Sequence, residues 1–384
     1  MSSTGSSDIW LVAVPNEVGP HETWEQLNSA ISKFSTNSRF HVPDLKVGKL
    51  DDLFFLSDQL ADLDRTTEAL VRKIAKYFAK ILHEQHAQLA DNLVVGNKDL
   101  HSFVTKFCWD GARYPIKQPV KTIKDNIARQ VDQIERNLKL RTADYNSIHE
   151  KLAAIDRNSK GSILVRDLSD LVSADDFILG SEYLQTIMVI VPKMFDSDWN
   201  ENYATYSEFV VPHSSRLIFD EGKYSLYSVT LFKRVISQFK AACKKKFTVR
   251  DFVYDKEIRE AGRNARDCLL QQRQKCYAPL ARWLKVNFGE AFSALIHIKA
   301  LRVFNESVLR FGLPVSFNAA VLLPKNGYQR RIRLELNELY KHLDSTACGS
   351  HGEGLDRFTL KAIGVGDEYF PYVFFKVNMD FLNE

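Results

Sequence analysis

One long stretch without glycine or proline constrains this chain more than any other feature of its sequence. Residues 120–160 follow Pro119, a residue type favoured in the first turn of helices, and the stretch ends at Gly161. The pattern predicts a single amphipathic helix, and the roughly 36 residues of its apolar stripe make a rod on the order of 54 Å long at 1.5 Å per residue. Its apolar stripe has spacings of three, four and seven residues: Val120, Ile123, Ile127, Val131, Ile134, Leu138, Tyr145, Ile148, Leu152 and Ile155.

A second long helix is predicted over residues 52–90, where only Thr67 interrupts the apolar stripe. The stripe consists of Leu53, Leu56, Leu60, Leu63, Leu70, Ile74, Phe78 and Ile81. The whole chain of 384 residues has only 17 glycines and 11 prolines, so it is short of loop-forming residues. The composition therefore predicts a helix-rich α+β protein and leaves little material for glycine-rich phosphate loops.

The remaining segments predict shorter elements. Residues 9–14 have the apolar character of a buried strand, and residues 23–34 have helical spacing. Residues 162–254 predict a compact α/β unit, with a hairpin turn at 220–223 and a helix capped by Thr230. Its expected strands are Ile163–Val165, Tyr183–Val191, Ser215–Phe219, Tyr224–Val229 and Phe247–Tyr254.

The C-terminal third predicts a polar helix over 256–275, a buried helix over 279–311, a helix around Ile332–Leu343 and a strand from Tyr369 to Val377. We expect the polar helix to pack through a thin stripe of small residues, which allows two helices to approach closely. The stripe is Ile258, Ala261, Ala265, either Cys268 or Leu269, and Cys276. No internal repeat is evident in the sequence.

Charge and cysteine content exclude several classes of protein. The net charge of +4 is too small to indicate nucleic-acid binding, and the interspersed signs suit a surface that meets protein partners. The five cysteines include no CxxC pair, which predicts reduced thiols and no zinc site. The apolar runs at 9–14 and 187–191 are too short for a signal peptide or a spanning helix, so we expect no direct membrane insertion.

The search for catalytic chemistry finds only weak candidates. The chain contains neither a P-loop nor a GxGxxG pattern, and the His83–His86 spacing does not match the HExxH zinc motif. Cys348 and His351 lie in a glycine-rich segment that we interpret as a surface loop. We expect His297 to be a hydrogen-bonded core residue and Asn305, in a glycosylation pattern, to lie within a helix. The sequence thus predicts no catalytic residues, no metal site and no cofactor.

Two basic clusters remain as candidate interaction sites. Lys244, Lys245 and Lys246 end a predicted helix, where cations complement the helix dipole. Arg330, Arg331 and Arg333 follow a predicted turn. Clusters of this size are usually solvated faces or protein contacts. We select Lys244, Lys245 and Lys246 as the candidate interface.

Several long segments resemble one known family, the C subunit of the eukaryotic vacuolar-type proton ATPase. The resemblance covers nearly the whole chain in order, and it is weakest at residues 2–7 and 349–366. The segments that carry it are FHVPDLKVGKLDDL (40–53), WDGARYPIKQPVKTIKDNIARQVDQIERNLKLR (109–141), SEYLQTIMVIVPK (181–193), KFTVRDFVYD (246–255), PLARWLKVNFGEAFSALIHIKALRVFNESVLRFGLPVSF (279–317) and ELYKHLDS (338–345).

The resemblance implies an elongated fold with three parts. A globular foot is expected from both chain ends, a neck from long antiparallel helices and a small α/β head from the middle. In this numbering the foot comprises 1–119 and 279–384, the neck 120–159 and 255–278, and the head 160–254.

The resemblance also implies a function. The C subunit is a non-catalytic stator of the cytosolic ATP-hydrolysing sector and supports its reversible assembly, and hence proton transport and organelle acidification. Its implied partners are the peripheral stalks, built of the E and G subunits, and the cytosolic domain of the membrane-bound a subunit. We therefore expect a cytoplasmic protein that reaches vacuolar, endolysosomal or plasma membranes through the pump. Actin binding is also attributed to the family, and the alternative hypothesis is an independent scaffold that binds actin or membrane surfaces.

Overall fold

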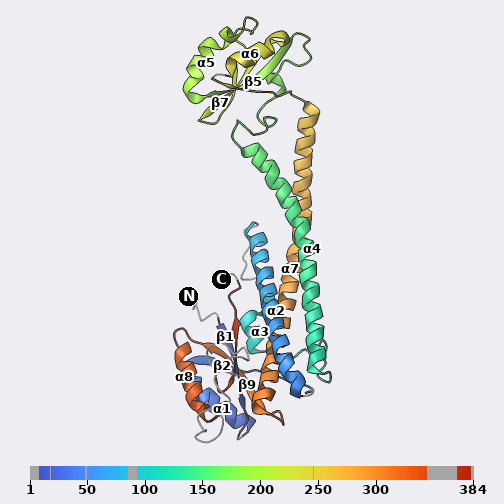
Figure 1. The fold of residues 1–384 in the computed structure, drawn as a ribbon, viewed down its shortest axis with the longest axis vertical. Helices are drawn as coiled ribbons and strands as arrows, with labels where there is room; N and C mark the ends of the chain where they lie inside the picture. Colours follow the sequence, from blue (N-terminus) through green and yellow to red (C-terminus); the bar gives the residue numbers. More distant parts are fainter. Residues whose placement is uncertain are drawn as a thin grey trace. The chain divides into compact units, whose positions relative to one another are not determined.

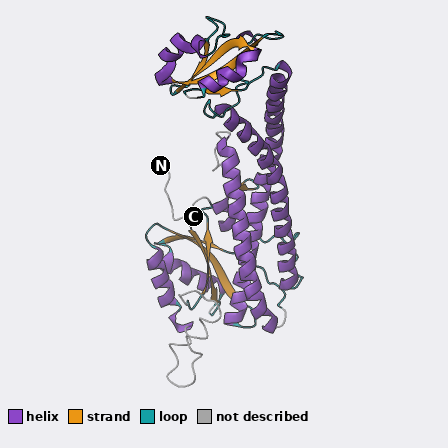
Figure 2. Ribbon diagram, turned by 45° about the horizontal axis from the view of Figure 1, so that its top comes forward, coloured by secondary structure: helices purple, strands orange, loops and turns teal. Residues whose placement is uncertain are grey.

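The computed structural model describes residues 8–17, 19–47, 50–84, 93–244, 246–343 and 370–381. The chain divides into two compact units (Figure 1). The larger unit contains Met1–Arg141 and Pro279–Glu384, and the smaller unit contains Thr142–Ala278. Each unit has its own antiparallel sheet, and helices make up most of the remainder (Figure 2). The expected helix-rich α+β class is confirmed.

The sheet of the larger unit joins segments from both ends of the chain. Its strand order is β10-β1-β9-β2, formed by Val373–Asn378, Asp8–Pro15, Phe317–Pro324 and Ser35–Arg39. All neighbours are antiparallel, and Trp10 of β1 lies opposite Lys376 on one side and Leu322 on the other. The central strand β1 is buried on both faces because its sequence is a continuous apolar run.

Helices cover both faces of this sheet. On one face lie α1 (Pro20–Ile31) and α8 (Gln329–Leu339), whose residues Leu27, Ile31, Ile332 and Leu336 share a core cluster with Trp10. On the other side of the larger unit, α2 (Leu50–Glu84), α3 (Leu100–Thr105) and parts of α4 (Val120–Lys160) and α7 (Lys256–Phe311) form a helical layer (Figure 1). A short hairpin of β3 (Val94–Val95) and β4 (Lys98–Asp99) and a 3₁₀ turn, η5 (Lys341–Leu343), complete the unit.

The long helices α2 and α4 confirm the predictions from apolar spacing. In α4, eight stripe residues are buried, from Val120 through Leu138 and again at Tyr145 and Leu152. In α2 the stripe shifts at one turn, where Asp64 is buried in place of Leu63. Residues 85–92, which end the predicted second helix, lie outside the described residues.

The structure joins the two helices predicted over 256–275 and 279–311 into the single helix α7, with Pro279 inside it. The buried residues of α7 lie in its second half, between Leu280 and Val308, although Val286 in this segment is 57% exposed. Gly289 approaches the β3–β4 hairpin closely, because an added Cβ would lie 3.2 Å from the carbonyl oxygen of Val94, so a side chain there would require the hairpin to shift by a few tenths of an ångström.

The predicted packing stripe in the first half of α7 is wrong. Ile258 is 68% exposed, and Ala261, Ala265 and Cys268 are exposed as well. Leu269, the alternative to Cys268 in the stripe, is half-buried, and two arginines of this half pair with carboxylates outside the helix. Arg266 pairs with Asp156 of α4 at 3.0 Å, and Arg263 lies 3.8 Å from Asp170. Both pairs lie within the smaller unit and are exposed.

The smaller unit is built on a four-stranded sheet of order β6-β7-β5-β8. The strands are β5 (Leu184–Pro192), β6 (Arg216–Asp220), β7 (Tyr224–Phe232) and β8 (Thr248–Arg250). The predicted hairpin turn at 220–223 is confirmed, with Gly222 at φ 85° and its N–H bonded to the Asp220 carboxylate. One face is covered by the helices α5 (Asp196–Asn202) and α6 (Ile236–Cys243) and by the 3₁₀ turn η3 (Tyr203–Tyr206). A 3₁₀ turn precedes each helix: η2 (Lys193–Phe195) before α5 and η4 (Lys233–Val235) before α6.

Three local predictions in the smaller unit need correction. Ile163–Val165 is a turn and not a strand, and the buried Ile163 packs against the second face of the sheet. Thr230 does not cap a helix, because β7 continues to Phe232 and α6 begins only at Ile236. The hydroxyl of Thr230 lies 3.2 Å from that of Thr186 on the neighbouring strand. The strand expected over Phe247–Tyr254 is shorter, since β8 ends at Arg250.

The structure also reveals an internal repeat that the sequence does not show. The order strand, 3₁₀ turn, α-helix occurs twice, as β5–η2–α5 and β7–η4–α6, and each element of the second copy begins 40 residues after its counterpart. Met188 pairs with Ser228, its own equivalent in the repeat, so an approximate twofold axis passes through this residue pair. The same symmetry relates two backbone hydrogen bonds of 2.9 Å. The N–H of Lys193 donates to the carbonyl oxygen of Lys223, and the N–H of Lys233 donates to the carbonyl oxygen of Tyr183.

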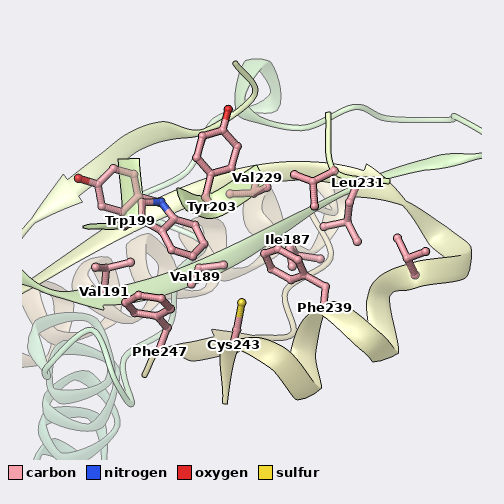
Figure 3. Close-up of a cluster of buried hydrophobic side chains, with 13 residues drawn as sticks. Ile187, Val189, Val191, Trp199, Tyr203, Val229, Leu231, Phe239, Cys243 and Phe247 are labelled. Carbon is pink, nitrogen blue, oxygen red and sulfur yellow. The ribbon is translucent and has the colours of Figure 1, made fainter. Parts of the chain in front are cut away.

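The core of the smaller unit follows this repeat. Five pairs of equivalent residues point into one buried cluster, which Figure 3 shows: Ile187 with Tyr227, Val189 with Val229, Val191 with Leu231, Trp199 with Phe239, and Tyr203 with Cys243. Because the axis is perpendicular to the sheet, both helices lie on the same face. Only three of the 21 equivalent positions in 183–203 and 223–243 are identical, at Val189, Lys193 and Ser197.

Candidate interaction surface

The residues considered for catalysis do not form a catalytic cluster among the parts of the chain that the structure describes. Cys348, His351 and His86 lie outside the described residues, and the side chain of His83 is not described either. Within the described residues, no group of three or more histidine, cysteine, aspartate and glutamate side chains could hold a metal ion. Cys108, Cys268 and Cys276 are exposed thiols, while burial raises the pKa of Cys243 to about 12.

His297 is a core histidine, as predicted. Its Nε2 accepts a hydrogen bond from the Asp110 backbone N–H at 3.1 Å, and its Nδ1 lies 2.7 Å from the Ser293 carbonyl oxygen. This pattern assigns the neutral tautomer with hydrogen on Nδ1. The rings of Phe107, Trp109 and Tyr114 surround it edge-on at 4.9–5.0 Å. Burial lowers the pKa of His297, partly opposed by its bond to Ser293.

This environment predicts a pH-dependent stability. Because the pKa is lower in the folded protein, the unfolded chain binds the proton more tightly. The stabilising contribution of neutral His297 should therefore be complete above pH ~6.5. Below that pH the free energy of unfolding should decrease as the pH falls, by at most about 1.4 kcal/mol per pH unit. Urea unfolding between pH 7.5 and 5.5 should show a steeper dependence for wild type than for His297→Gln. Equal slopes for the two proteins would contradict this account.

The basic cluster on α8 is engaged inside the larger unit. The guanidinium of Arg331 pairs with Glu335 at 2.7 Å. Arg333 lies over the rings of Trp10, Phe370 and Phe374, at 5.5–5.7 Å from their centroids. Asn305 is also internal, because its buried amide donates to the Leu53 carbonyl oxygen at 3.1 Å. The structure thus explains Arg333 by packing, while Arg330 and Arg331 are exposed, and the burial of Asn305 excludes it as a surface acceptor for glycans.

The lysines selected as the interface lie directly after α6. Lys244 is exposed, while Lys245 lies outside the described residues. Lys246 binds Asp198 of α5 at 3.0 Å, and its Nζ lies 5.9 Å from the Phe195 ring centroid. The hydrogen bond between them raises the pKa of Lys246 and lowers that of Asp198. Lys246 therefore links the two helices of the repeat, and Lys244 is the more available of the two.

The two copies of the repeat carry opposite charge. The first copy presents Asp196, Asp198 and Glu201 from α5. The second presents a basic set from η4 and α6 and the residues that follow: Lys233, Arg234, Lys240, Lys244 and Lys246. A surface of this kind suits charged protein segments better than a small substrate.

A buried ionic cluster in the larger unit was not predicted from the sequence. The Asp64 carboxylate accepts hydrogen bonds from Lys299 at 2.8 Å and from Arg302. Asp64 and Lys299 are only 3% and 4% exposed. The signal available in the sequence was Lys299, which lies within the strongly apolar segment 291–304. A buried cation needs an anionic partner, so this lysine could have indicated a buried ionic cluster. The cluster links α2 to α7 and is internal, so we assign it to stability.

The described helices include none that combines the length and the apolar character needed to cross a membrane.

Comparisons with known proteins give one consistent result. The family model of the V-ATPase C subunit matches residues 9–373. A V-type proton ATPase C subunit from Caenorhabditis elegans is 53% identical over 385 aligned residues, which cover 100% of both chains. The C subunit of Manduca sexta is 46% identical and the C 1 subunit of Rattus norvegicus 43% identical, each covering 98% of this chain and 99% of the relative.

Proposed function

This chain belongs to the V-ATPase C subunit family, and we propose that it acts as a non-catalytic peripheral stalk component of a V-type proton pump. The observation that carries the proposal is the full-length similarity, because 53% identity extends over all of both chains. A match of this kind includes both units and every long helix, and it is not confined to a fold shared by unrelated proteins.

The proposed partners are those of the family. We propose that the chain binds the E–G stalks and the cytosolic domain of the membrane-bound a subunit, and so supports assembly of the ATP-hydrolysing sector on the membrane sector. The mixed-charge surface favours such contacts, because reversible interfaces are more polar than permanent ones. The chain would then be cytoplasmic and would reach membranes through the pump.

The proposed division of labour follows the expected boundaries. Residues 160–254 would form the head, residues 120–159 and 255–278 the neck, and residues 1–119 and 279–384 the foot. The neck assignment is supported by α4 and α7, whose backbones continue without interruption through these residues.

The non-catalytic role predicts a defect of assembly. Cells that lack this chain should keep the membrane sector in place while most catalytic subunits remain in the cytosol, and organelle acidification should be lost. Membrane fractionation and a pH-sensitive dye would measure both effects, with re-expression of the wild-type chain as the control. Normal acidification without the chain would contradict the proposal.

The proposed lysine interface is tested in the same cells with the variant Lys244→Glu. If this variant co-purifies with the stalk proteins as well as the wild-type chain does, Lys244 is not part of the interface.

A further inference from the structure

A compact loop joins α3 to α4 in the larger unit, and we call its residues 107–118 the Trp109 loop. None of these residues lies in a helix or a strand, yet Trp109 and Tyr114 are only 8% and 4% exposed. Compact surface loops that are packed by their own side chains are frequently functional. The contacts that attach this loop to the helices therefore decide when it can move.

Hydrogen bonds within the Trp109 loop hold it together as one piece. The Trp109 Nε1–H donates to the Tyr114 carbonyl oxygen at 2.8 Å, and the Tyr114 N–H donates to the Asp110 carbonyl oxygen at 2.9 Å. One carboxylate oxygen of Asp110 accepts from the N–H groups of Ala112 and Arg113, both at 3.1 Å. The loop can therefore leave the neighbouring helices without losing these bonds.

Two polar contacts of different character attach the loop to α7. The Asp110 N–H donates to His297 Nε2 at 3.1 Å, and His297 is 1% exposed. The Arg113 guanidinium forms a bidentate pair with the Glu290 carboxylate, but the side chains are 46% and 33% exposed. Exposed ion pairs contribute little to stability. The bond to the buried histidine is therefore the attachment on which the position of the loop depends most.

His297 can hold the loop only while its ring is neutral. Its Nδ1–H points to the Ser293 carbonyl oxygen at 2.7 Å, so the lone pair of Nε2 is the acceptor for the Asp110 N–H. A proton on Nε2 would place two N–H donors opposite each other and leave the Asp110 N–H without an acceptor. It would also place a charge in a site lined by aromatic rings. Both effects are unfavourable in a buried site.

The charged groups around His297 do not relieve this conflict. Burial is the largest influence on the pKa of His297 and lowers it, while Asp110 raises it and Arg113 lowers it. Arg113 is itself paired with Glu290 of α7. Burial raises the pKa of Tyr114 to about 12, so this phenol stays neutral, and the other two rings against the histidine carry no charge. The closed loop therefore disfavours the second proton.

We infer that His297 is a pH-sensitive latch: uptake of one proton from solvent at its Nε2 releases the Trp109 loop from α7 while the rest of the larger unit stays folded. In the open loop the solvated imidazole has its ordinary pKa of ~6.5, so release begins as the pH falls below that value. Opening exposes the rings of Trp109 and Tyr114. The latch belongs to the larger unit alone and does not rest on the proposed role in a proton pump.

Hydrogen exchange of the full-length chain at pH 7.5 and pH 5.5, corrected for the intrinsic pH dependence of exchange, tests the latch. An open-state pKa of ~6.5 multiplies the opening equilibrium about tenfold over this range. Protection of the Asp110 and Tyr114 amides should therefore fall about tenfold. Low concentrations of urea should leave this exchange unchanged and accelerate that of β1 and β9, because local opening exposes little surface and global unfolding exposes much.

Variants at two histidines identify the group that takes up the proton. His297→Gln keeps an acceptor for the Asp110 N–H but does not titrate, so protection of the loop should differ by less than about twofold between the two pH values. His101→Gln is the matched control at an exposed histidine on α3, and it should keep the change of about tenfold.

A third variant tests whether the loop moves away from α4 as well. The Tyr114 hydroxyl donates to the Gln130 side chain of α4 at 2.7 Å. Tyr114→Phe removes this bond and keeps the ring, so it should lower protection of the loop roughly fivefold at both pH values. The ratio between the two pH values should remain about tenfold, because His297 is unchanged.

Several results would overturn the latch. Equal protection of the loop at both pH values in the wild-type chain would do so without any variant. A tenfold change that persists in His297→Gln would assign the pH response to another group. If the loop amides have the same protection and the same urea dependence as those of β1 and β9, the loop opens only when the whole unit unfolds. Unchanged protection in Tyr114→Phe would show that exchange does not require the loop to leave α4.

Discussion

Replacing Asp64 by alanine is expected to lower the free energy of unfolding of the larger unit by about 3–5 kcal/mol. The carboxylate is 3% exposed and accepts from Lys299 and Arg302. Arg302 is partly exposed and also lies over the Phe375 ring, so it can turn to solvent. Lys299 cannot, because it is 4% exposed in the buried part of α7. The large cost therefore comes from a buried ammonium group that loses its counter-ion.

Urea unfolding followed by circular dichroism would measure this loss, with Asp62→Ala as the matched control. Asp62 is two residues earlier on α2 and pairs with Arg65, but both side chains are at least 70% exposed. Removing an exposed pair should cost less than about 1 kcal/mol. The double variant Asp64→Leu with Lys299→Met should recover most of the stability, because apolar residues can replace a buried ion pair. A loss below about 1 kcal/mol for Asp64→Ala would contradict the account.

Replacing Trp199 by alanine is expected to destabilise the smaller unit by about 3–5 kcal/mol. Trp199 is a fully buried member of the cluster in Figure 3, and its Nε1–H donates to the Ser215 hydroxyl at 3.1 Å. Its ring lies 5.1–6.3 Å from the rings of Tyr203, Tyr206, Tyr227 and Phe247. No neighbouring side chain can fill the space of an indole, so a cavity should remain.

Hydrogen exchange gives this prediction an internal control. Amides of β5 and β7 should exchange faster in Trp199→Ala, while amides of β1 and β9 in the larger unit should keep their wild-type rates. Trp199→Phe keeps an aromatic ring and should show a smaller effect in the same direction. Unaltered protection of β5 and β7 would show that the cluster does not depend on Trp199.

The sequence predicted best what depends on neighbouring residues. The helical stripes of α2 and α4 repeat every three or four positions, so their spacing indicated the helices and their buried faces. The prediction failed where distant segments decide the outcome. No strand was predicted at β9, and β9 pairs with β1 about 300 residues away. Asp64 is buried for the same reason, because its partner Lys299 lies on a helix far along the chain.

The candidate surface was only partly visible in the sequence. The run Lys244–Lys246 stands out as a cluster, yet the structure shows Lys246 bound to Asp198. The segments near residues 183, 209 and 233 are joined by backbone hydrogen bonds, and no local sequence pattern connects them. Only the pairing of β5 with β7 brings these segments together. The internal repeat was hidden because its two copies share burial and order of elements but few identical residues.

The twofold repeat in the smaller unit has the geometry of a symmetric dimer within one chain. In a dimer of identical chains every substitution appears at both ends of the shared strand pair, so both ends must keep the same properties. Fusion into one chain removes that constraint. Here Lys193 is held by its own carboxylates at one end, while Arg234 stands on Phe209 without a carboxylate among the described residues at the other. The covalent link thus lets a symmetric scaffold carry a different charge environment at each of its two ends.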